Sequence, residues 1–172
     1  MKFININKLF TARKILISLS LSLIIGILSL AIAPPQAMAI DYNKQMLMEK
    51  DFSHQDLTDA SFDHTNLRGS DFSFSNAQGV RFFGANLAGA NLEGVNLKFA
   101  DLESSRMSKA NLTNANLEGA YMTNVMLDGA VIEGADFSGA LMRPLTEEKL
   151  CEIATGTNPE TGRDTKDTLF CP

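Results

Sequence analysis

Residues 85–94 read ANLAGANLEG, which is two consecutive copies of the pattern Ala-Asn-Leu-x-Gly. A third copy, ANLEG, occupies residues 115–119. Outward from these copies, the same period of five continues without an insertion over residues 50–144, a total of 95 residues or 19 pentapeptides. The central residue of every pentapeptide is large and apolar except Ala77. One short repeat therefore decides the fold of most of this chain.

The other positions of the pentapeptide are nearly as regular. The residue two before the centre is Ala, Ser, Thr or Val in 17 of the 19 copies, with Lys50 and Gln55 as the exceptions. Asp or Asn directly precedes the centre in 12 copies, and nine of the twelve glycines stand two residues after it. A period of five matches neither an α-helix nor a flat β-strand. The chain must turn once per pentapeptide, so we expect a solenoid whose coils bury a core by stacking on one another.

Residues 85–94 and 115–119 resemble the A(D/N)LxG motif of the pentapeptide-repeat family. The resemblance implies an all-β solenoid, a right-handed β-helix with four sides and four pentapeptides per coil. Residues 50–144 would then form about five coils.

The flanks of the repeat are expected to be caps, because open solenoid ends expose core and strand edges. Residues 40–49 are interpreted as an N-terminal cap and residues 145–172 as a C-terminal cap. In the latter, we expect a helix that begins at Glu147 after an N-cap at Thr146 and stops near Gly156. Its hydrophobic staple would join Leu145 to Leu150.

Residues 1–39 have the composition of a secretory leader. They hold four basic residues and no acidic one, and residues 15–33 are nineteen uncharged residues that end before two prolines. Ala37 and Ala39 fit the small-residue signal for cleavage, so we expect a signal peptide that is cleaved after Ala39. The alternative is an uncleaved membrane anchor, because nineteen apolar residues are just long enough to span a bilayer.

Cys151 and Cys171 are the only cysteines. A pair of cysteines in an exported protein predicts a disulfide. A metal site would need further ligands, and residues 145–172 contain no histidine.

The rest of the composition argues against several functions. Residues 40–172 hold 11 basic and 20 acidic residues, a net charge of -9, which disfavours a nucleic-acid partner. The sequence offers no catalytic set, phosphate-binding loop or metal motif, so we expect no enzyme activity, cofactor or small-molecule substrate. His54 and His64 would lie on opposite corners of a four-sided coil and are interpreted as solvated turn residues.

The Asp and Asn residues that precede the centres would stack in columns, one of which contains Asp56, Asn76, Asn96, Asn116 and Asp136. Cation binding is one interpretation of such a column. We favour the other, in which short side chains form hydrogen bonds to nearby backbone groups and to each other.

On one face of the solenoid, the residue before the centre is most often a residue other than Asp or Asn. This face, with Arg81, Phe83, Glu103 and Tyr121, is our candidate partner face. Arginine and aromatic residues often dominate interface energies, and we expect Phe83 to project outward. The alternative is self-covering, in which the C-terminal segment lies over the apolar exceptions Tyr121, Met126, Val131 and Leu141.

The leader, the repeat and residues 154–162 followed by Cys171 together resemble the thylakoid-lumen pentapeptide-repeat proteins of photosynthetic cells. This resemblance implies a non-catalytic structural or protein-interaction module in the thylakoid lumen, with the periplasm as the second location. Its partner would be an unidentified lumenal or membrane-edge protein. Two alternatives remain, a DNA-mimicking topoisomerase inhibitor and a membrane-anchored scaffold that keeps its leader.

Overall fold

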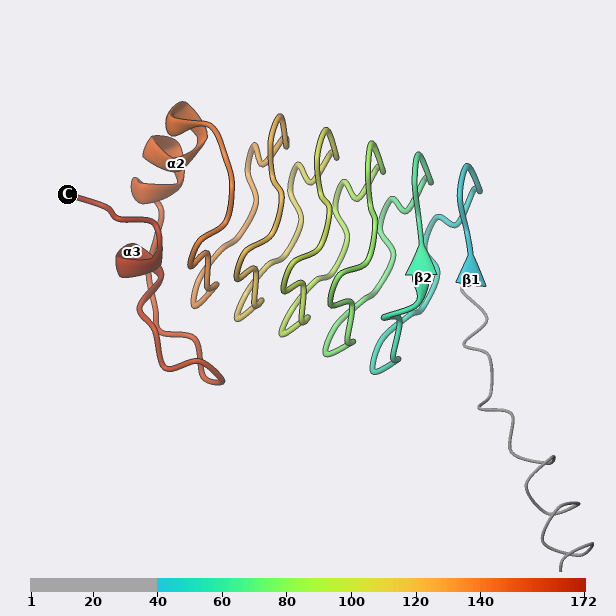
Figure 1. Ribbon diagram of the computed structural model, residues 1–172, viewed down its shortest axis with the longest axis horizontal. Helices are drawn as coiled ribbons and strands as arrows, with labels where there is room; N and C mark the ends of the chain where they lie inside the picture. The colour runs from blue at the N-terminus through green and yellow to red at the C-terminus, as the bar shows by residue number, and fades with distance from the viewer. Residues whose placement is uncertain (1–39) are drawn as a thin grey trace, which may run out of the picture. The chain divides into compact units, whose positions relative to one another are not determined.

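The computed structural model describes residues 40–172, which fall within one compact unit. The predicted signal peptide, with its cleavage residues Ala37 and Ala39, lies outside the described residues. The elements in chain order are β1 (Ile40–Asp41), β2 (Ala60–Ser61), α2 (Pro144–Cys151) and α3 (Thr165–Thr168). Figure 1 shows a stack of similar coils between β1 at one end and the two helices at the other. Neither helix of the described residues is long and apolar enough to cross a bilayer.

Each coil contains twenty residues. Parallel bridges join residues that are twenty apart, as in Asp56↔Asn76, Asn76↔Asn96 and Asn96↔Asn116. Twenty residues are four pentapeptides, so each coil has four sides, as the resemblance implied. Residues 40–49, which we interpreted as the N-terminal cap, share this register: β1 pairs with β2, and Met46 pairs with Asn66.

Three backbone hydrogen bonds on each regular side hold neighbouring coils together, two donated toward the following coil and one donated toward the preceding coil. On one side, the Phe72 N–H donates to the Asn91 carbonyl at 2.8 Å, and the Asn91 N–H donates to the Ser70 carbonyl at 2.9 Å. The corner between two sides is a tight turn, such as the one closed by the Ala90 N–H and the Leu87 carbonyl at 3.0 Å. The residue two after the centre has positive φ in every pentapeptide except at Asp59 and Pro144, which explains why glycine is frequent there.

The central side chains form the core. In the N-terminal half the core is aromatic: Tyr42, Phe62 and Phe82 stack with ring centroids 4.8 and 5.1 Å apart. Phe52 and Phe72 form a second stack at 4.8 Å and meet the first edge-on. Leucine and methionine continue the core toward the C-terminus, where Leu97, Leu102 and Met107 are fully buried.

Helix α2 begins three residues earlier than the sequence predicted. Arg143 is its N-cap residue, without a capping side-chain hydrogen bond, and Pro144 occupies the first turn, where a missing N–H costs nothing. Thr146 is therefore not the N-cap, and the helix ends at Cys151, before Gly156. Leu150 is buried, but Leu145 is 64% exposed, so the predicted staple is absent.

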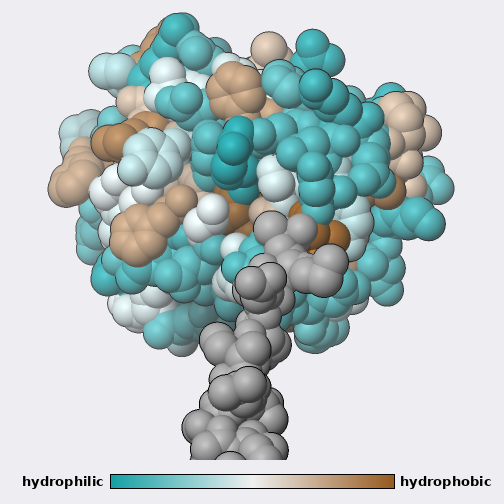
Figure 2. All heavy atoms as spheres, turned by 45° about the vertical axis from the view of Figure 1, so that its right-hand side comes forward, coloured by the Kyte–Doolittle hydropathy of each residue, from teal (hydrophilic) through white to brown (hydrophobic). Residues whose placement is uncertain are grey.

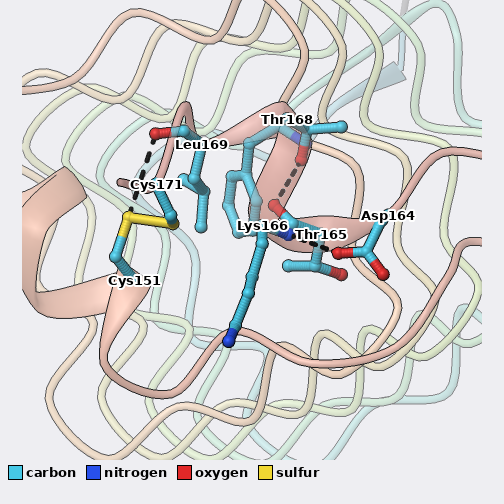
Figure 3. Close-up of a disulfide and its surroundings, with 8 residues drawn as sticks. Cys151, Asp164, Thr165, Lys166, Thr168, Leu169 and Cys171 are labelled. Atoms are coloured by element: carbon cyan, nitrogen blue, oxygen red, sulfur yellow. Dashed lines mark hydrogen bonds between the residues drawn. A yellow bond between two sulfur atoms is a disulfide. The ribbon is translucent and has the colours of Figure 1, made fainter.

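Residues 144–172, hereafter the C-terminal segment, fold back on the last coil. The predicted disulfide is confirmed: Cys151 at the end of α2 is bonded to Cys171, with Cα atoms 5.5 Å apart. Figure 3 shows this bond beside α3, where the Asp164 carboxylate accepts a hydrogen bond from the Lys166 N–H at 3.0 Å and caps the helix. The disulfide therefore joins the chain after α3 to α2.

Candidate interaction surfaces

The candidate partner face is one continuous side of the solenoid. Parallel bridges run along it from Ser61 to Arg81, Asp101, Tyr121 and Leu141. Arg81 and Tyr121 thus share one column, as predicted.

Arg81 and Phe83 contact neighbouring side chains that the sequence analysis did not anticipate. The Arg81 guanidinium forms an ion pair with Asp63, one coil earlier, although the Arg81 side chain stays 61% exposed. Phe83 is half-buried, and its ring lies edge-on to the exposed side chain of His64 at 5.4 Å. Glu103 is also half-buried. Of the four candidate residues, Arg81 and Tyr121 are therefore exposed, and Leu141 of the same column is exposed as well.

The C-terminal segment does not cover the apolar exceptions of the last coil. Tyr121 is 47% exposed and Leu141 is 55% exposed. Met126 and Val131, on the next two sides, are 48% and 50% exposed. Figure 2, seen from the β1 side, shows a mostly hydrophilic surface with apolar residues in separate patches. The self-covering interpretation of these four side chains is thus wrong.

The Asp/Asn columns are ladders of side-chain hydrogen bonds. The Asn96 Nδ2 donates to the Asn76 Oδ1 at 2.9 Å, and the Asn91 Nδ2 donates to the Asp71 Oδ1 at 3.1 Å. The same oxygens accept backbone N–H groups two residues later, for example Ser73 N–H to Asp71 at 2.8 Å. Hydrogen bonds from Ser73 hold the pKa of Asp71 below its usual value. The favoured interpretation is confirmed for these residues.

His54 and His64 belong to different corner columns. His54 stacks on Phe74 with ring centroids 5.4 Å apart, whereas His64 leans over Gly84 of its own column. Within residues 40–172, no three His, Cys, Asp or Glu side chains are grouped so that they could hold a metal ion.

Sequence reasoning missed an ion-pair cluster that joins the C-terminal segment to the solenoid. Arg163 Nη1 lies 3.1 Å from Glu118 Oε2 and 3.0 Å from Asp136 Oδ2, and Lys98 lies 2.8 Å from Glu118. Burial acts to raise the pKa of Asp136, but hydrogen bonds from Ser138 and the Arg163 charge outweigh it and lower the pKa. The register of twenty, which places Lys98, Glu118 and Ser138 in one column, was the available signal.

Asn158 is a second anchor that the sequence did not reveal. Its side chain is fully buried, and its Nδ2 lies 3.0 Å from the Asn114 carbonyl and 2.9 Å from the Gly134 carbonyl. Its Oδ1 accepts the N–H groups of Glu160 and Thr161, each at 3.0 Å. We find no sequence pattern that would have identified this contact.

Comparison with known proteins agrees with this geometry. The family model for pentapeptide repeats matches residues 51–82, 75–114 and 105–143. The crystal structure of a pentapeptide repeat protein from the Arabidopsis thaliana thylakoid lumen is 42% identical, with a TM-score of 0.74 over 76% of this chain and 90% of that one. The pentapeptide repeat protein Rfr23 of the cyanobacterium Cyanothece 51142 is 21% identical, with a TM-score of 0.43, over 62% of this chain and 86% of that one.

A curated relative, the thylakoid lumenal protein TL20.3 of Arabidopsis thaliana, is 54% identical over 37 residues. This match spans 22% of the present chain and only 13% of the relative. The repeat matches together cover residues 51–143 without a gap, which is more than half of the chain, and they coincide with the twenty-residue coils that the structure describes. The chain therefore belongs to the pentapeptide-repeat family, whose fold is a right-handed, four-sided β-helix.

Proposed function

We propose that this protein is a non-catalytic scaffold of the thylakoid lumen that binds another protein through the Arg81–Tyr121 side of its solenoid. Residues 50–144 would provide about five rigid coils, and the C-terminal segment would cap them. The proposal draws support from the similar protein of the Arabidopsis thylakoid lumen, which is matched over 90% of its length.

One observation supports the choice of this side. Tyr121 and Leu141 stand where the repeat favours Asp or Asn, and both side chains are about half exposed. Exposed aromatic, aliphatic and arginine side chains on one surface are typical of a protein-binding surface. Arg81 lies two coils from Tyr121 in the same column, so the three residues would contact one partner along the solenoid axis.

Site-specific crosslinking tests this side directly. A photoreactive phenylalanine derivative at position 121 should attach to a partner in isolated thylakoid lumen, because position 121 would lie inside the interface. The matched control carries the same group at Val131, which has similar exposure and the same repeat position on another side. Identical adducts from both positions, or adducts from neither, would contradict the proposal.

The proposed form of the protein is free in the lumen after removal of its leader. We predict a mature N-terminus at Ile40, because Ala37 and Ala39 fit a cleavage signal after a basic and apolar leader. Terminal sequencing of the protein from fractionated cells measures this. A chain that starts at Met1 and sediments with membranes would support the anchored alternative, and recovery from the periplasm would contradict the lumenal location.

A further inference from the structure

The C-terminal end of the solenoid is closed unevenly. Within the stack, N–H groups of each coil donate to carbonyls of the next coil, so the last coil depends on residues 140–172 for acceptors. Three of its four sides obtain at least one. The donor–acceptor pairs are Met122 N–H to Leu141 O (2.8 Å), Gly134 N–H to Thr155 O (2.8 Å) and Phe137 N–H to Thr168 Oγ1 (3.1 Å).

The fourth side, residues 125–130, is an open strand edge. One coil earlier, the N–H groups of Met107 and Lys109 donate to carbonyls of the last coil at 2.8 and 3.0 Å. Their equivalents, Leu127 N–H and Gly129 N–H, have no acceptor among residues 40–172. The Val125 carbonyl likewise receives no N–H from the described part of the chain. Two N–H donors and one carbonyl acceptor therefore remain unpaired within the described residues, in the alternating order in which a parallel strand would pair with them.

A hollow of about 570 Å³ lies beside this edge, between residues 125–130 and the end of α2. Its rim includes Met126 and Ile153, each about half exposed, and Leu150 of α2 also lines it. The register of twenty would have placed residues 145–149 on this edge. Because Pro144 starts a helix instead, the chain leaves the ladder and the edge stays open.

We infer that the open edge at residues 125–130 binds an extended peptide segment of a partner protein by strand addition. Only an extended backbone presents carbonyl and N–H groups at the spacing that satisfies Leu127, Gly129 and Val125 together. The hollow falls in the size range of ligand-binding clefts, roughly 300–1,000 Å³. The site is separate from the Arg81–Tyr121 side, and it does not depend on that side's function.

The rim defines the chemistry of the segment. Two acidic residues, Asp128 and Glu152, line the hollow, and Lys149 is the one basic residue among its lining residues. Basic residues in the bound segment are therefore favoured. An apolar residue would point inward above Leu127, as Leu127 itself lies above Met107 in the core. A second copy of this chain fits poorly, because α2 borders the edge and residues 140–172 are bonded to the other three sides.

A synthetic peptide with the sequence of residues 104–110, SSRMSKA, is a suitable probe. In the protein this segment already pairs with residues 124–130 from below, and it supplies two basic residues around Met107. Titration of the fluorescently labelled peptide with the intact protein should give saturable binding. Hydrogen exchange should slow at the Leu127 and Gly129 amides and stay unchanged at Gly134, whose N–H is already bonded.

Matched variants distinguish strand addition from nonspecific binding of the peptide. Met126→Lys should weaken the peptide at least about tenfold, because it removes an apolar rim and repels the basic probe. Val131→Lys, at the same repeat position but outside the hollow, should leave affinity within about twofold, a difference of only ~0.4 kcal/mol. A peptide N-methylated at the arginine cannot donate to the Val125 carbonyl and should not bind.

Several results would overturn the inference. They are absence of saturation at millimolar peptide, equal affinity for Met126→Lys and the unaltered protein, or equal binding of the N-methylated peptide. Protection of Leu127 that grows with protein concentration alone, together with a dimer in sedimentation, would identify a second copy as the occupant instead. Tyr121→Ala should bind the probe normally, which keeps this test independent of the proposed partner face.

Discussion

Individual corner residues couple coils that are twenty residues apart. His64, Phe74 and Phe99 have positive φ and extend toward the corner of the following coil. A Cβ atom added to Gly94 would lie 2.6 Å from the Phe74 ring, and one added to Gly119 would lie 2.6 Å from the Phe99 ring. Glycine at these corners is therefore required by the neighbouring side chain as well as by the backbone conformation.

Two glycine variants separate these causes. Gly89→Ala should lower the free energy of unfolding by about 1–2 kcal/mol, the cost of placing alanine in the left-handed conformation, because nothing lies within 4 Å of its Cβ position. Gly119→Ala has a similar φ but meets Phe99, so we expect a further ~1–3 kcal/mol from overpacking. Urea unfolding measures both free energies. In a Phe99→Ala background the extra cost should disappear, and equal costs in both backgrounds would contradict the coupling.

The sequence predicted the residues and contacts that follow the columns of the repeat and missed contacts between side chains of different columns. The central column needed only the pentapeptide, and the bond from Asn96 to Asn76 needed in addition the four-sided coil that the family resemblance implied. The ring of Phe83 packs edge-on to His64, which belongs to a different column, and no column rule brings these two side chains together. Gln55 departs from the small residues that the repeat favours two positions before the centre. In the structure its side chain has a partner on the first coil, because its Nε2 donates to the Asp51 carbonyl at 3.3 Å.

Among the elements, the N-terminal coils differ from the others in their aromatic core. Phe72 and Phe82 meet edge-on with centroids 5.7 Å apart, and Ala77 lies between them in the chain, fully buried. The small central residue therefore coincides with the bulkiest part of the core. We interpret the small side chain of Ala77 as leaving the volume that the rings of Phe72 and Phe82 need, so that each ring can stack on the aromatic ring of the preceding coil.

This interpretation predicts that Ala77→Leu destabilises the protein. The added side chain would overpack against the rings, at a cost of about 1–3 kcal/mol. The exposed neighbour Gln78 is the control, since Gln78→Leu should change stability by no more than about 0.5 kcal/mol. Thermal unfolding of both variants measures the difference. A raised melting temperature for Ala77→Leu would show that a void exists there.

Helix α2 shows why element boundaries were harder to predict than the repeat. Thr146 followed by two glutamates fits an N-terminal signature, yet Pro144 already has the φ of a first helical residue. Both starts satisfy local rules, and packing selects between them, because the observed helix buries Leu150 and leaves Leu145 in solvent. The disulfide was predictable because only two cysteines exist.

At the scale of the whole molecule, stability is nearly a sum of contributions from neighbouring coils. The disulfide spans twenty residues within the C-terminal segment, and loop-closure entropy gives it a value of roughly 3 kcal/mol. Reduction should therefore speed hydrogen exchange in residues 144–172 while residues 85–119 stay protected. A Cys151→Ser, Cys171→Ser double variant should behave like the reduced protein. Unfolding of the entire solenoid on reduction would show that the C-terminal segment supports every coil.

Arg163 ties the C-terminal segment to the solenoid through charge, so this attachment depends on pH. The folded state lowers the pKa of Asp136, which means that it favours the ionised carboxylate. The resulting stability is present at neutral pH. It is lost as pH falls below the ordinary Asp value of about 3.9, where the unfolded chain binds a proton first, and it vanishes below the folded pKa. Glu118, whose pKa is also lowered by Lys98 and Arg163, changes in the same direction.

Arg163→Gln tests this attachment. The variant leaves the buried Asp136 carboxylate without its cation, so the C-terminal segment should lose about 1–3 kcal/mol at neutral pH. Because burial then acts on Asp136 with less opposition, its folded-state pKa should rise toward the unfolded value, so the variant should be less stable at neutral pH but should lose less further stability on acidification. Exchange at the Gly134 amide, which donates to Thr155, reports the detachment locally. Arg106→Gln, at an exposed position outside the described ion pairs, should leave that exchange unchanged at every pH. If both variants behave alike, hydrophobic contacts and the disulfide hold the segment, and the ion pairs contribute nothing measurable.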